Sequence, residues 1–254
     1  MVCTFHDLFV LTGEYSTPEF RARFADQARL AAERADCIIA VSRFTADQVQ
    51  TLLGVDRGRV RVVHHGVQPP NPPPGIERES IVLHVGAIQT RKNISRLVEA
   101  FETMPKDWRL YFVGSSGFDG ENILDQISQS PATSRIVLTG YVSMSQLEEL
   151  YARASIFAFP SLDEGFGMPI LDAMARGVPV ITSSVSALPE VAGNAALLVN
   201  PLDTGDIAGG LDRLSSDVEL RRKLVRNGYE RVKQFSWAKA VDQTRQIYRE
   251  LTGR

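Results

Sequence analysis

Short apolar segments recur along most of the chain, and each ends at a residue that favours a turn. A short apolar run bounded by turn residues is typical of a buried strand. Between these runs lie patterns with a helical period, as at Ile94, Leu97, Val98 and Phe101. After the proline-rich middle of the chain, the predicted strands cover residues 81–86, 109–114, 135–140, 155–160, 178–183 and 196–200. Strands that alternate with helices in this way predict a parallel sheet covered on both faces, which is a complete doubly wound α/β domain.

The first 67 residues repeat this alternation with fewer elements. We predict strands at residues 2–5, 37–41 and 60–64, a helix that begins at Thr17-Pro18 and a second helix over residues 45–53. So small a domain buries only a modest fraction of its surface and is marginal alone. Two interpretations stay open: the front of this domain is absent from the chain, or the domain is a small three-stranded cap.

A proline-rich segment, QPPNPPPGI, separates the two parts. Prolines lack an amide donor and restrict φ, so we predict a stiff, extended linker. The chain ends in a helix with an apolar face that can pack across to the first domain; this face consists of Trp237, Val241, Thr244, Tyr248 and Leu251. The predicted organisation is a partial N-terminal domain over 1–67, the linker over 68–78, a C-terminal domain over 79–235 and the final helix over 236–254.

The composition, with 44% hydrophobic and 23% charged residues among 254, is that of a folded globular protein. The net charge of −2 gives no overall attraction for nucleic acid or an anionic membrane, so any anion site must be local. No apolar segment approaches the roughly 20 residues that a spanning helix needs. We therefore expect a cytoplasmic protein without a transmembrane segment. Cys3 and Cys37 show no metal-binding spacing, and we expect no metal.

The strongest local motif is SLDEGFGMPILDAMARG. Gly165 and Gly167, on either side of Phe166, let the backbone approach a ligand closely, and the proline that follows suits the first turn of a helix. Amides that converge at a helix N-terminus bind anions. Glu164 and Asp172 can accept hydrogen bonds from sugar and ribose hydroxyls. Taken alone, the same two carboxylates are more typical of a helix-capping acid beside a solvated one.

A second motif, Thr90-Arg91-Lys92-Asn93, follows the predicted strand at 81–86. Asn93 is a good N-cap for the next helix, so we expect Arg91 and Lys92 beside a helix N-terminus. Cations there oppose the helix dipole, and a diphosphate bound between them would resolve the conflict. Two solvated basic residues in a loop are the alternative interpretation.

Histidines follow two of the predicted N-terminal strands. His6 comes after the first strand, and the carboxyl ends of parallel strands face the ligand crevice of such folds. A single histidine is nevertheless more often a core or loop residue. The turn at His64-His65 has no acidic or cysteine neighbours, which indicates a domain boundary rather than a metal site.

Together these segments resemble the retaining GT-B glycosyltransferases of family 4. The resemblance rests on HVGAIQTRKNISRLVEAF, LYFVGSSG, the stretch from IVLTGYV to ALLVNP and the terminal FSW helix, which cover nearly all of residues 80–250. VCTFHDL, AERADCIIAVSRFT and VRVVHHGV resemble the latter part of the family's N-terminal domain. The resemblance implies an α/β protein with two Rossmann-like doubly wound parallel-sheet domains, of which the N-terminal one is incomplete.

The resemblance also implies roles for particular residues. Arg91 and Lys92 would hold the donor diphosphate, and Glu164 would contact the donor sugar. His6 would line the reaction centre from the N-terminal side. His6 and Glu164 are therefore the catalytic candidates.

Other positions would complete the donor site. The loop at 165–167 would approach the sugar and the phosphates. Asp172 stands where the family has a glutamate that binds the ribose, so its side chain is shorter by one methylene. Tyr141 and Val142 lie where the family contacts the base.

The implied activity is transfer of a mannose-like or glucose-like hexose from a nucleoside diphosphate sugar to a sugar, lipid or polysaccharide acceptor, with retention of configuration and no cofactor. Peripheral contact with a membrane stays open. The family's glycine-rich loop near the start of the N-terminal domain has no counterpart here, so the alternative is a nucleotide-sugar-binding remnant without transferase activity. A nicotinamide dehydrogenase is disfavoured because residues 114–120 lack the second glycine of GxGxxG, and an epimerase matches the DEGFGMPILDAMA segment less closely.

Overall fold

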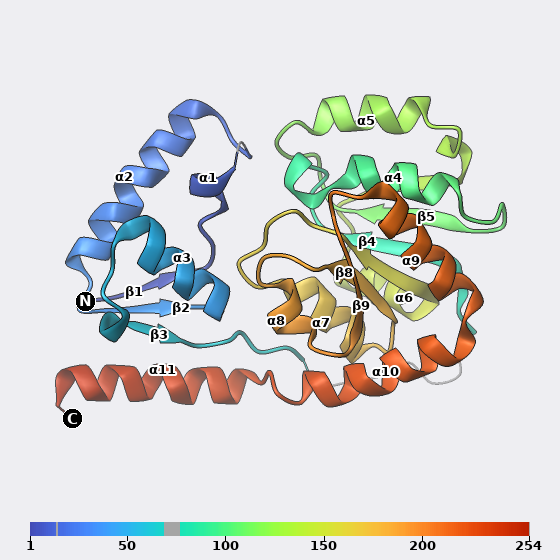
Figure 1. Ribbon diagram of the computed structural model, residues 1–254. Coiled ribbons are helices and arrows are strands. Elements are labelled where there is room, and N and C mark those ends of the chain that lie inside the picture. Colours follow the sequence, from blue (N-terminus) through green and yellow to red (C-terminus); the bar gives the residue numbers. More distant parts are fainter. Residues whose placement is uncertain (14, 69–76, 254) are drawn as a thin grey trace.

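The computed structural model of the chain describes residues 1–13, 15–68 and 77–253. Two α/β domains lie side by side, and each is built on a parallel β-sheet (Figure 1). The predicted α/β fold with two parallel-sheet domains is thereby confirmed. Most of the predicted linker, and with it the prediction of a stiff extended segment, lies outside the described residues.

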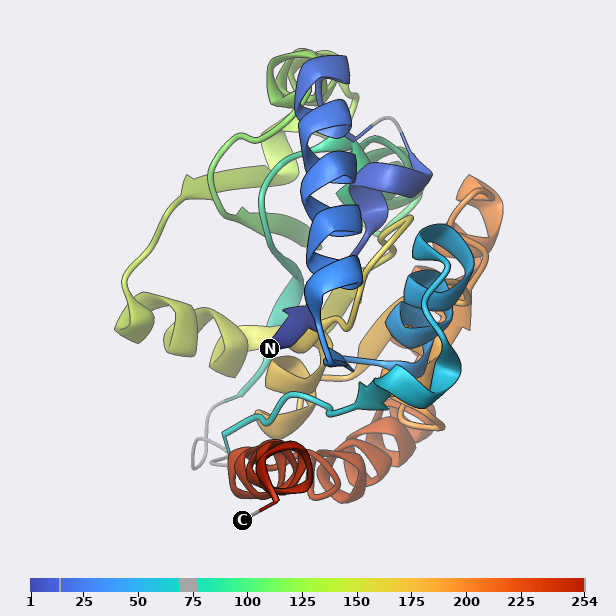
Figure 2. The same ribbon diagram turned by 90° about the vertical axis from the view of Figure 1, so that its left-hand side faces the viewer.

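The N-terminal domain has a sheet of three parallel strands in the order β1-β2-β3. Its elements are β1 (Val2–Phe5), α1 (Phe9–Thr12), α2 (Pro18–Arg34), β2 (Cys37–Ala40), α3 (Arg43–Leu53), the 3-10 turn η1 (Arg57–Arg59) and β3 (Val60–Val62). Phe5 and Ile38 belong to one face of the sheet, where they pack against Ala28 and Ala32 of α2 and Val49 of α3. Figure 2 shows this domain from its outer side, with α2 in front of the sheet.

Capping residues set where the two long N-terminal helices begin. The side chain of Thr17 accepts a hydrogen bond from the amide of Phe20, with proline in the first turn of α2. The α3 helix begins at Arg43, two residues earlier than predicted, because Ser42 is its N-cap. The Ser42 hydroxyl oxygen accepts a hydrogen bond from the backbone amide of Thr45 at 3.0 Å. The helix ends, as the sequence predicts, at Gly54 in the left-handed conformation.

The C-terminal domain has a sheet of six parallel strands in the order β6-β5-β4-β7-β8-β9. Its strands are β4 (Glu79–Val85), β5 (Arg109–Val113), β6 (Ile136–Gly140), β7 (Ala154–Phe159), β8 (Val180–Ser183) and β9 (Ala196–Val199). Its helices are η2 (Thr90–Lys92), α4 (Ile94–Glu102), α5 (Gly120–Gln129), η3 (Thr133–Arg135), α6 (Met144–Arg153), α7 (Met168–Ala175), α8 (Leu188–Ala192), α9 (Thr204–Ser216) and α10 (Val218–Val232). Each face of the sheet has its own apolar core, one around Phe157 and Phe159 and one around Phe101 and Phe112.

The strand order reverses between β4 and β7, because the chain builds outward from β4 in one direction and then returns to pair β7 on its other side. The loops that leave the two strands must therefore diverge, which opens a crevice at their carboxyl ends. Ligands of open α/β sheets bind in such a crevice. The two motifs singled out in the sequence follow these two strands.

The last helix, α11 (Trp237–Thr252), crosses from the C-terminal domain and lies along the N-terminal sheet (Figure 1). The prediction of which face of α11 contacts the N-terminal domain is wrong in part. The residues of α11 that are buried are Ala240 and Ile247, which pack against Ile39 of β2 and against Val63, directly after β3. The predicted face stays largely open: Trp237, Val241, Tyr248 and Leu251 are 44–50% exposed. Among the described residues, this sheet has three strands. A sheet so narrow covers one stripe of the helix, and hydrophobic periodicity alone could not place that stripe.

Candidate active site

Lys92 and Glu164 meet at the crevice between β4 and β7. Lys92 lies in η2, after β4, and Glu164 lies in the loop that joins β7 to α7. The Lys92 Nζ atom donates to Glu164 Oε1 at 2.5 Å, and Arg91 Nη1 lies 2.9 Å from Glu164 Oε2. Each of the three side chains is only 10% exposed. The structure thus brings together the predicted diphosphate-binding and sugar-binding residues in one buried ionic cluster.

The charges of this cluster depend on one another. Burial by itself raises the pKa of Glu164, but Lys92 and Arg91 outweigh burial, so the pKa lies below its usual value. Burial lowers the pKa of Lys92, and the Glu164 carboxylate opposes that shift. Arg91 also keeps a buried Nε donor that has no hydrogen-bond partner within the described part of the chain. Two cations share one carboxylate, and one of them retains an unused donor.

Two further carboxyl groups adjoin the cluster, and the sequence analysis did not assign them a role. Asp163 accepts a hydrogen bond from Thr12 Oγ1 at 2.8 Å, and its carbonyl oxygen accepts from Arg91 Nη1 at 2.6 Å. Burial raises the pKa of both Asp163 and Asp7. In the sequence, Asp163 adjoins Glu164 and Asp7 adjoins His6, and this was the signal that could have marked them as site residues. It was a weak signal, because a second acidic residue in a loop is usually solvated.

Asn93 does not cap α4 with its side chain, contrary to the prediction. Its backbone is left-handed, with φ of 60°, and its side chain makes no capping hydrogen bond. The side-chain Nδ2 of Asn93 instead donates to the carbonyl oxygens of Pro160 at 3.0 Å and Pro201 at 2.7 Å. The left-handed backbone turns the side chain away from the helix, so the first amides of α4 have no side-chain acceptor.

The Gly165–Phe166–Gly167 loop packs directly against the N-terminal domain. A Cβ atom at Gly165 would clash with the carbonyl oxygen of His6, so only glycine permits this approach. The Gly165 carbonyl oxygen accepts hydrogen bonds from the hydroxyls of Ser42 and Thr45 at 2.6 and 3.0 Å. Gly167, with φ of 98°, stands at the N-cap of α7. The loop therefore joins the β4–β7 crevice to the ends of β1 and β2.

His6 forms a stacked pair with His65. Their ring centroids are 5.3 Å apart, with an interplanar angle of 10°, and His6 Nδ1 lies 3.3 Å from His65 Nε2. His65 also meets the Phe166 ring edge-on at 5.2 Å. Burial, together with the neighbouring His6 and His64, lowers the pKa of His65. The sequence analysis treated the His64-His65 turn only as a boundary; the structure makes His65 a neighbour of the predicted catalytic His6.

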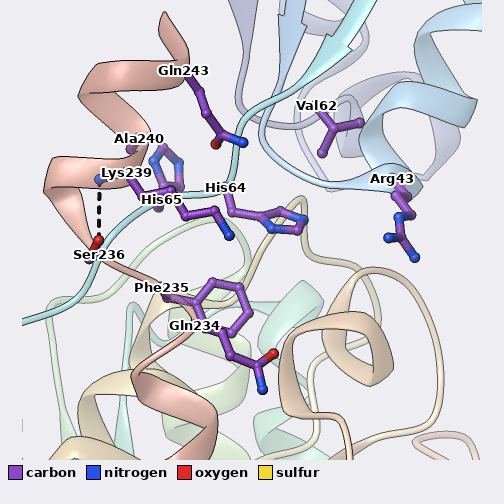
Figure 3. Close-up of a pocket in the computed structure, with 10 residues that line it drawn as sticks. All are labelled: Arg43, Val62, His64, His65, Gln234, Phe235, Ser236, Lys239, Ala240 and Gln243. Carbon is purple, nitrogen blue, oxygen red and sulfur yellow. Dashed lines mark hydrogen bonds between the residues drawn. The ribbon is translucent and has the colours of Figure 1, made fainter.

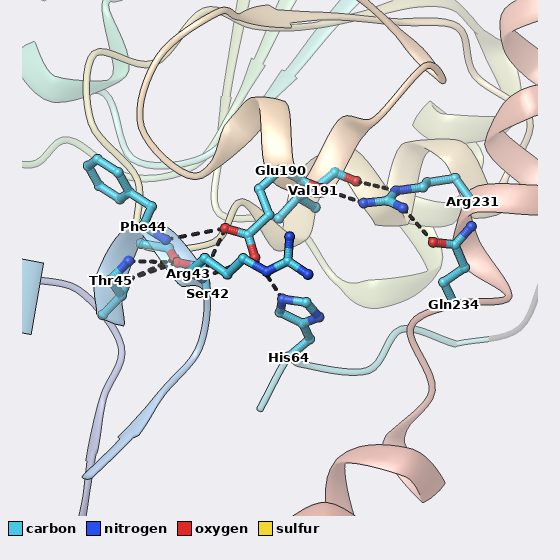
Figure 4. A network of polar contacts seen from close by, with 10 residues as sticks. Ser42, Arg43, Phe44, Thr45, His64, Glu190, Val191, Arg231 and Gln234 are labelled. Atoms are coloured by element: carbon cyan, nitrogen blue, oxygen red, sulfur yellow. Dashed lines mark hydrogen bonds and ion pairs between the residues drawn. The ribbon is translucent and has the colours of Figure 1, made fainter. Parts of the chain in front are cut away.

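Glu190 holds the two domains together from α8 (Figure 4). Its carboxylate accepts from the backbone amides of Arg43, at 2.9 and 3.0 Å, and Phe44, at 3.2 Å, at the start of α3. Its Oε1 atom also lies 2.8 Å from His64 Nε2. On the other side, Arg231 donates to the backbone carbonyl oxygens of Glu190 and Val191, in the second half of α8. Nothing in the local sequence of Glu190 distinguishes it from a solvated helix acid.

The predicted ribose and base contacts lie apart from the ionic cluster. Asp172, in α7, lies 3.3 Å from Arg176 Nη1, and burial raises the pKa of its carboxyl group. Arg176 also pairs with Glu148 of α6. Tyr141 follows β6 with 89% of its surface exposed, whereas Val142 packs against the core. A ligand that touched all the predicted residues would span the crevice from β6 to α7.

Within residues 1–13, 15–68 and 77–253, no group of three or more histidine, cysteine, aspartate or glutamate residues is arranged to hold a metal ion. None of the helices described is both long and apolar enough to cross a membrane.

The sequence matches two families of known proteins. Residues 71–231 match the family described as "Glycosyl transferases group 1", and residues 1–69 match "Glycosyltransferase Family 4". The chain is 30% identical to O-antigen chain mannosyltransferase B of Escherichia coli, over 98% of this chain and 70% of that protein. It therefore belongs to the group 1, family 4 glycosyltransferases, has their GT-B fold and is a hexosyltransferase by class.

Solved structures show the same architecture. The sucrose-phosphate synthase of Thermosynechococcus elongatus superposes with a TM-score of 0.85 at 28% identity, over 99% of this chain and 68% of that one. HepE of Anabaena, in complex with UDP and glucose, has the same fold, with a TM-score of 0.82 at 19% identity, over 100% of this chain and 71% of that one. Some relatives are much longer: the chain spans 32% of the serotype-specific mannosyltransferase WbdA of Escherichia coli, at 30% identity.

Proposed function

We propose that this protein transfers a hexose from a nucleoside diphosphate sugar to a glycan or other hydroxyl acceptor, with retention of configuration. The observation that carries the proposal is the cluster of Arg91, Lys92 and Glu164 at the β4–β7 crevice. The cluster faces the end of β1, where His6 lies against Gly165. Donor and acceptor would meet between these two surfaces.

The cluster has the chemistry that the leaving group requires. As the bond between the anomeric carbon and the diphosphate oxygen breaks, negative charge develops on the diphosphate and positive charge on the sugar ring. Arg91 and Lys92 would stabilise the diphosphate, together with the α4 amides that lack a side-chain cap. Arg91 Nε, which is buried without a partner within the described residues, would supply a further donor.

Glu164 would change partners when the donor binds. In the structure it neutralises Lys92 and Arg91, which a diphosphate would also attract. Sugar hydroxyls could then donate to the released carboxylate. For retention, the acceptor hydroxyl would attack from the face that the diphosphate leaves. Its oxygen would bond to the anomeric carbon, and its proton would pass to the departing diphosphate oxygen.

We propose no metal and no other cofactor for this reaction, because two cationic side chains are positioned to do the electrostatic work. A mannose-like sugar is supported by the mannosyltransferase of Escherichia coli, and a glucose-like sugar by the HepE complex with UDP and glucose. The acceptor class that we propose is a sugar, lipid-linked or polysaccharide hydroxyl.

Calorimetric titration with UDP, GDP and ADP tests the donor site. We expect one nucleotide to bind and its binding to be lost in a Glu164→Ala, Lys92→Ala double variant. A Glu149→Ala, Lys106→Ala variant loses the same charges at two exposed positions and should bind normally. If no nucleotide binds, or if the double variant binds as well as the parent, the proposed donor site is wrong.

Incubation with the matching nucleotide sugar and simple glycoside acceptors then tests transfer, and NMR of the anomeric proton of the product tests retention. Binding without transfer would favour the alternative, a nucleotide-sugar-binding remnant. An inverted anomeric centre would contradict the proposed stereochemistry.

A further inference from the structure

A small polar pocket lies at the boundary between the two domains (Figure 3). Its volume is about 230 Å³, which is smaller than a typical drug-sized site of roughly 300 Å³ or more. The N-terminal domain and the turn between α10 and α11 both contribute walls. The polar residues that line it are Arg43, His64, His65, Gln234, Lys239 and Gln243.

Cations in this pocket have no counter-charge. The side chains of Arg43 and Lys239 make no hydrogen bond or ion pair with any described residue, and no carboxylate lines the pocket. In the view of Figure 3, the two side chains lie on opposite sides of the His64 ring. Their positive charges therefore act on the same small volume from two directions.

The carboxylate of Glu190 contacts His64 but is not part of the pocket lining. Both of its oxygens are already used, because they accept from His64 Nε2 and from the amides of Arg43 and Phe44. This carboxylate accepts hydrogen bonds from the first amides of α3, and the guanidinium of Arg43 has no partner among the described residues.

Two of the neutral side chains in the pocket have acceptors that are already occupied. Gln234 Oε1 accepts a hydrogen bond from Arg231, so the NH₂ group of the Gln234 side chain is left for the pocket. Ser236 Oγ accepts from the Lys239 amide. A pocket with two unpaired cations and surplus N–H donors fits a small oxyanion.

We propose that this pocket binds a phosphate group, either as the free ion or as a phosphomonoester, between Arg43 and Lys239. The site is distinct from the ionic cluster of Lys92 and Glu164, and the proposal does not depend on the proposed transferase function. Because Arg43 belongs to the N-terminal domain and Lys239 to α11, the ligand would bridge the two parts of the chain.

Calorimetric titration with inorganic phosphate in low-salt buffer tests the site, because salt screens interactions between exposed charges. We expect binding that weakens at least about tenfold in an Arg43→Ala, Lys239→Ala variant, as removal of charge-assisted hydrogen bonds implies. An Arg213→Ala, Lys223→Ala variant loses the same charge at two exposed positions of α9 and α10 and should bind as the parent does. Thermal denaturation of each variant checks that it is folded.

The titration is repeated in a Lys92→Ala background, which disables the proposed donor site. Phosphate binding should persist there, so failure of the donor site cannot be confused with failure of this one. Glycerol 1-phosphate and glycerol provide the remaining arms. Tighter binding of glycerol 1-phosphate would identify an organic phosphate as the ligand, and tighter binding of inorganic phosphate the free ion. Absence of binding by both phosphates, equal binding of glycerol, or full binding by the Arg43→Ala, Lys239→Ala variant would overturn the proposal.

Discussion

The ammonium group of Lys92 lies 2.5 Å from the carboxylate of Glu164, although 72 positions separate the two residues in the sequence. The ion pair forms because β4 and β7 are neighbours in the sheet, so the loops that follow them share one edge. Both side chains are buried, and a second cation, Arg91, shares the carboxylate.

Replacement of Lys92 by alanine should slow hexose transfer about 10²-fold to 10³-fold, because it removes a fixed charge from the developing diphosphate. The loss of stability should stay below the roughly 3–5 kcal/mol typical of a broken buried pair, because Arg91 still neutralises Glu164. Steady-state kinetics and thermal denaturation, with Lys106→Ala as an exposed control, provide the measurements. Near-normal transfer by Lys92→Ala would remove Lys92 from the site.

Substitution of Gly165 by alanine should destabilise the contact between the domains by about 1–3 kcal/mol, as expected for overpacking, because the new Cβ would clash with the His6 carbonyl oxygen. The matched control is Gly209→Ala in α9, where a Cβ would meet nothing within 4 Å. In a helix interior that change should stabilise by roughly 0.5–1 kcal/mol. Urea denaturation of both variants measures the two changes in the free energy of unfolding, which should have opposite signs. Equal changes in the two variants would argue against close packing at Gly165.

The Glu190 network should make stability depend on pH. Although burial raises the pKa of Glu190, its hydrogen bonds with His64 and with the amides of Arg43 and Phe44 lower the pKa below its ordinary value. The network therefore stabilises the fold above about pH 4.3, the value in an unfolded chain, and its contribution is lost as the pH falls through the folded pKa.

A Glu190→Gln variant should accordingly be about 2 kcal/mol less stable than the parent at pH 7, with a difference that shrinks below pH 4. Urea denaturation at several pH values measures this difference. Glu219→Gln, which breaks only an exposed pair with Arg222, should cost under about 0.5 kcal/mol. A difference between Glu190→Gln and the parent that does not vary with pH would rule out the ionised carboxylate as its source.

The pairing of His6 with His65 can be followed by NMR titration. The pKa of His65 should lie below 6.5, mainly because of burial and also because of His6 and His64. In a His6→Ala variant the pKa of His65 should rise, since one of the groups that lowers it is gone. His84, which is fully buried with a pKa lowered to about 4, should titrate unchanged and serves as an internal reference. An unaltered pKa of His65 would show that the two rings do not interact in solution.

Helix and strand positions were predictable where local sequence and packing agree. The strands of the C-terminal sheet lie within about two residues of their predicted bounds, because each is a continuous apolar run that ends at a turn. The α9 helix was not predicted, since Gly209 and Gly210 lower its helix propensity. Packing explains one of them: a Cβ at Gly210 would press on Ile181 of β8.

The candidate site was likewise predictable only in part. The residue types at Arg91, Lys92 and Glu164 marked them as candidates, because cations and a carboxylate beside glycine-rich turns are the groups that bind phosphates and sugars. Their mutual contacts, and the pairing of His65 with His6, depend on strands that meet only in the folded sheets. The side chain of Asn93 could not be placed from the sequence. Asparagine is a good capping residue, but this side chain donates instead to two carbonyl oxygens that are distant in the sequence.

The sequence by itself determined the alternation of strands and helices, because that depends on periodicity. Its motifs also predicted the GT-B fold and the family, through their resemblance to the family 4 glycosyltransferases. Only the tertiary structure decided which charges neutralise one another, which face of α11 is buried and how Glu190 links the domains. Ion pairs and burial depend on distances between segments far apart in the chain, and those distances are set by strand order and domain packing rather than by neighbouring residues.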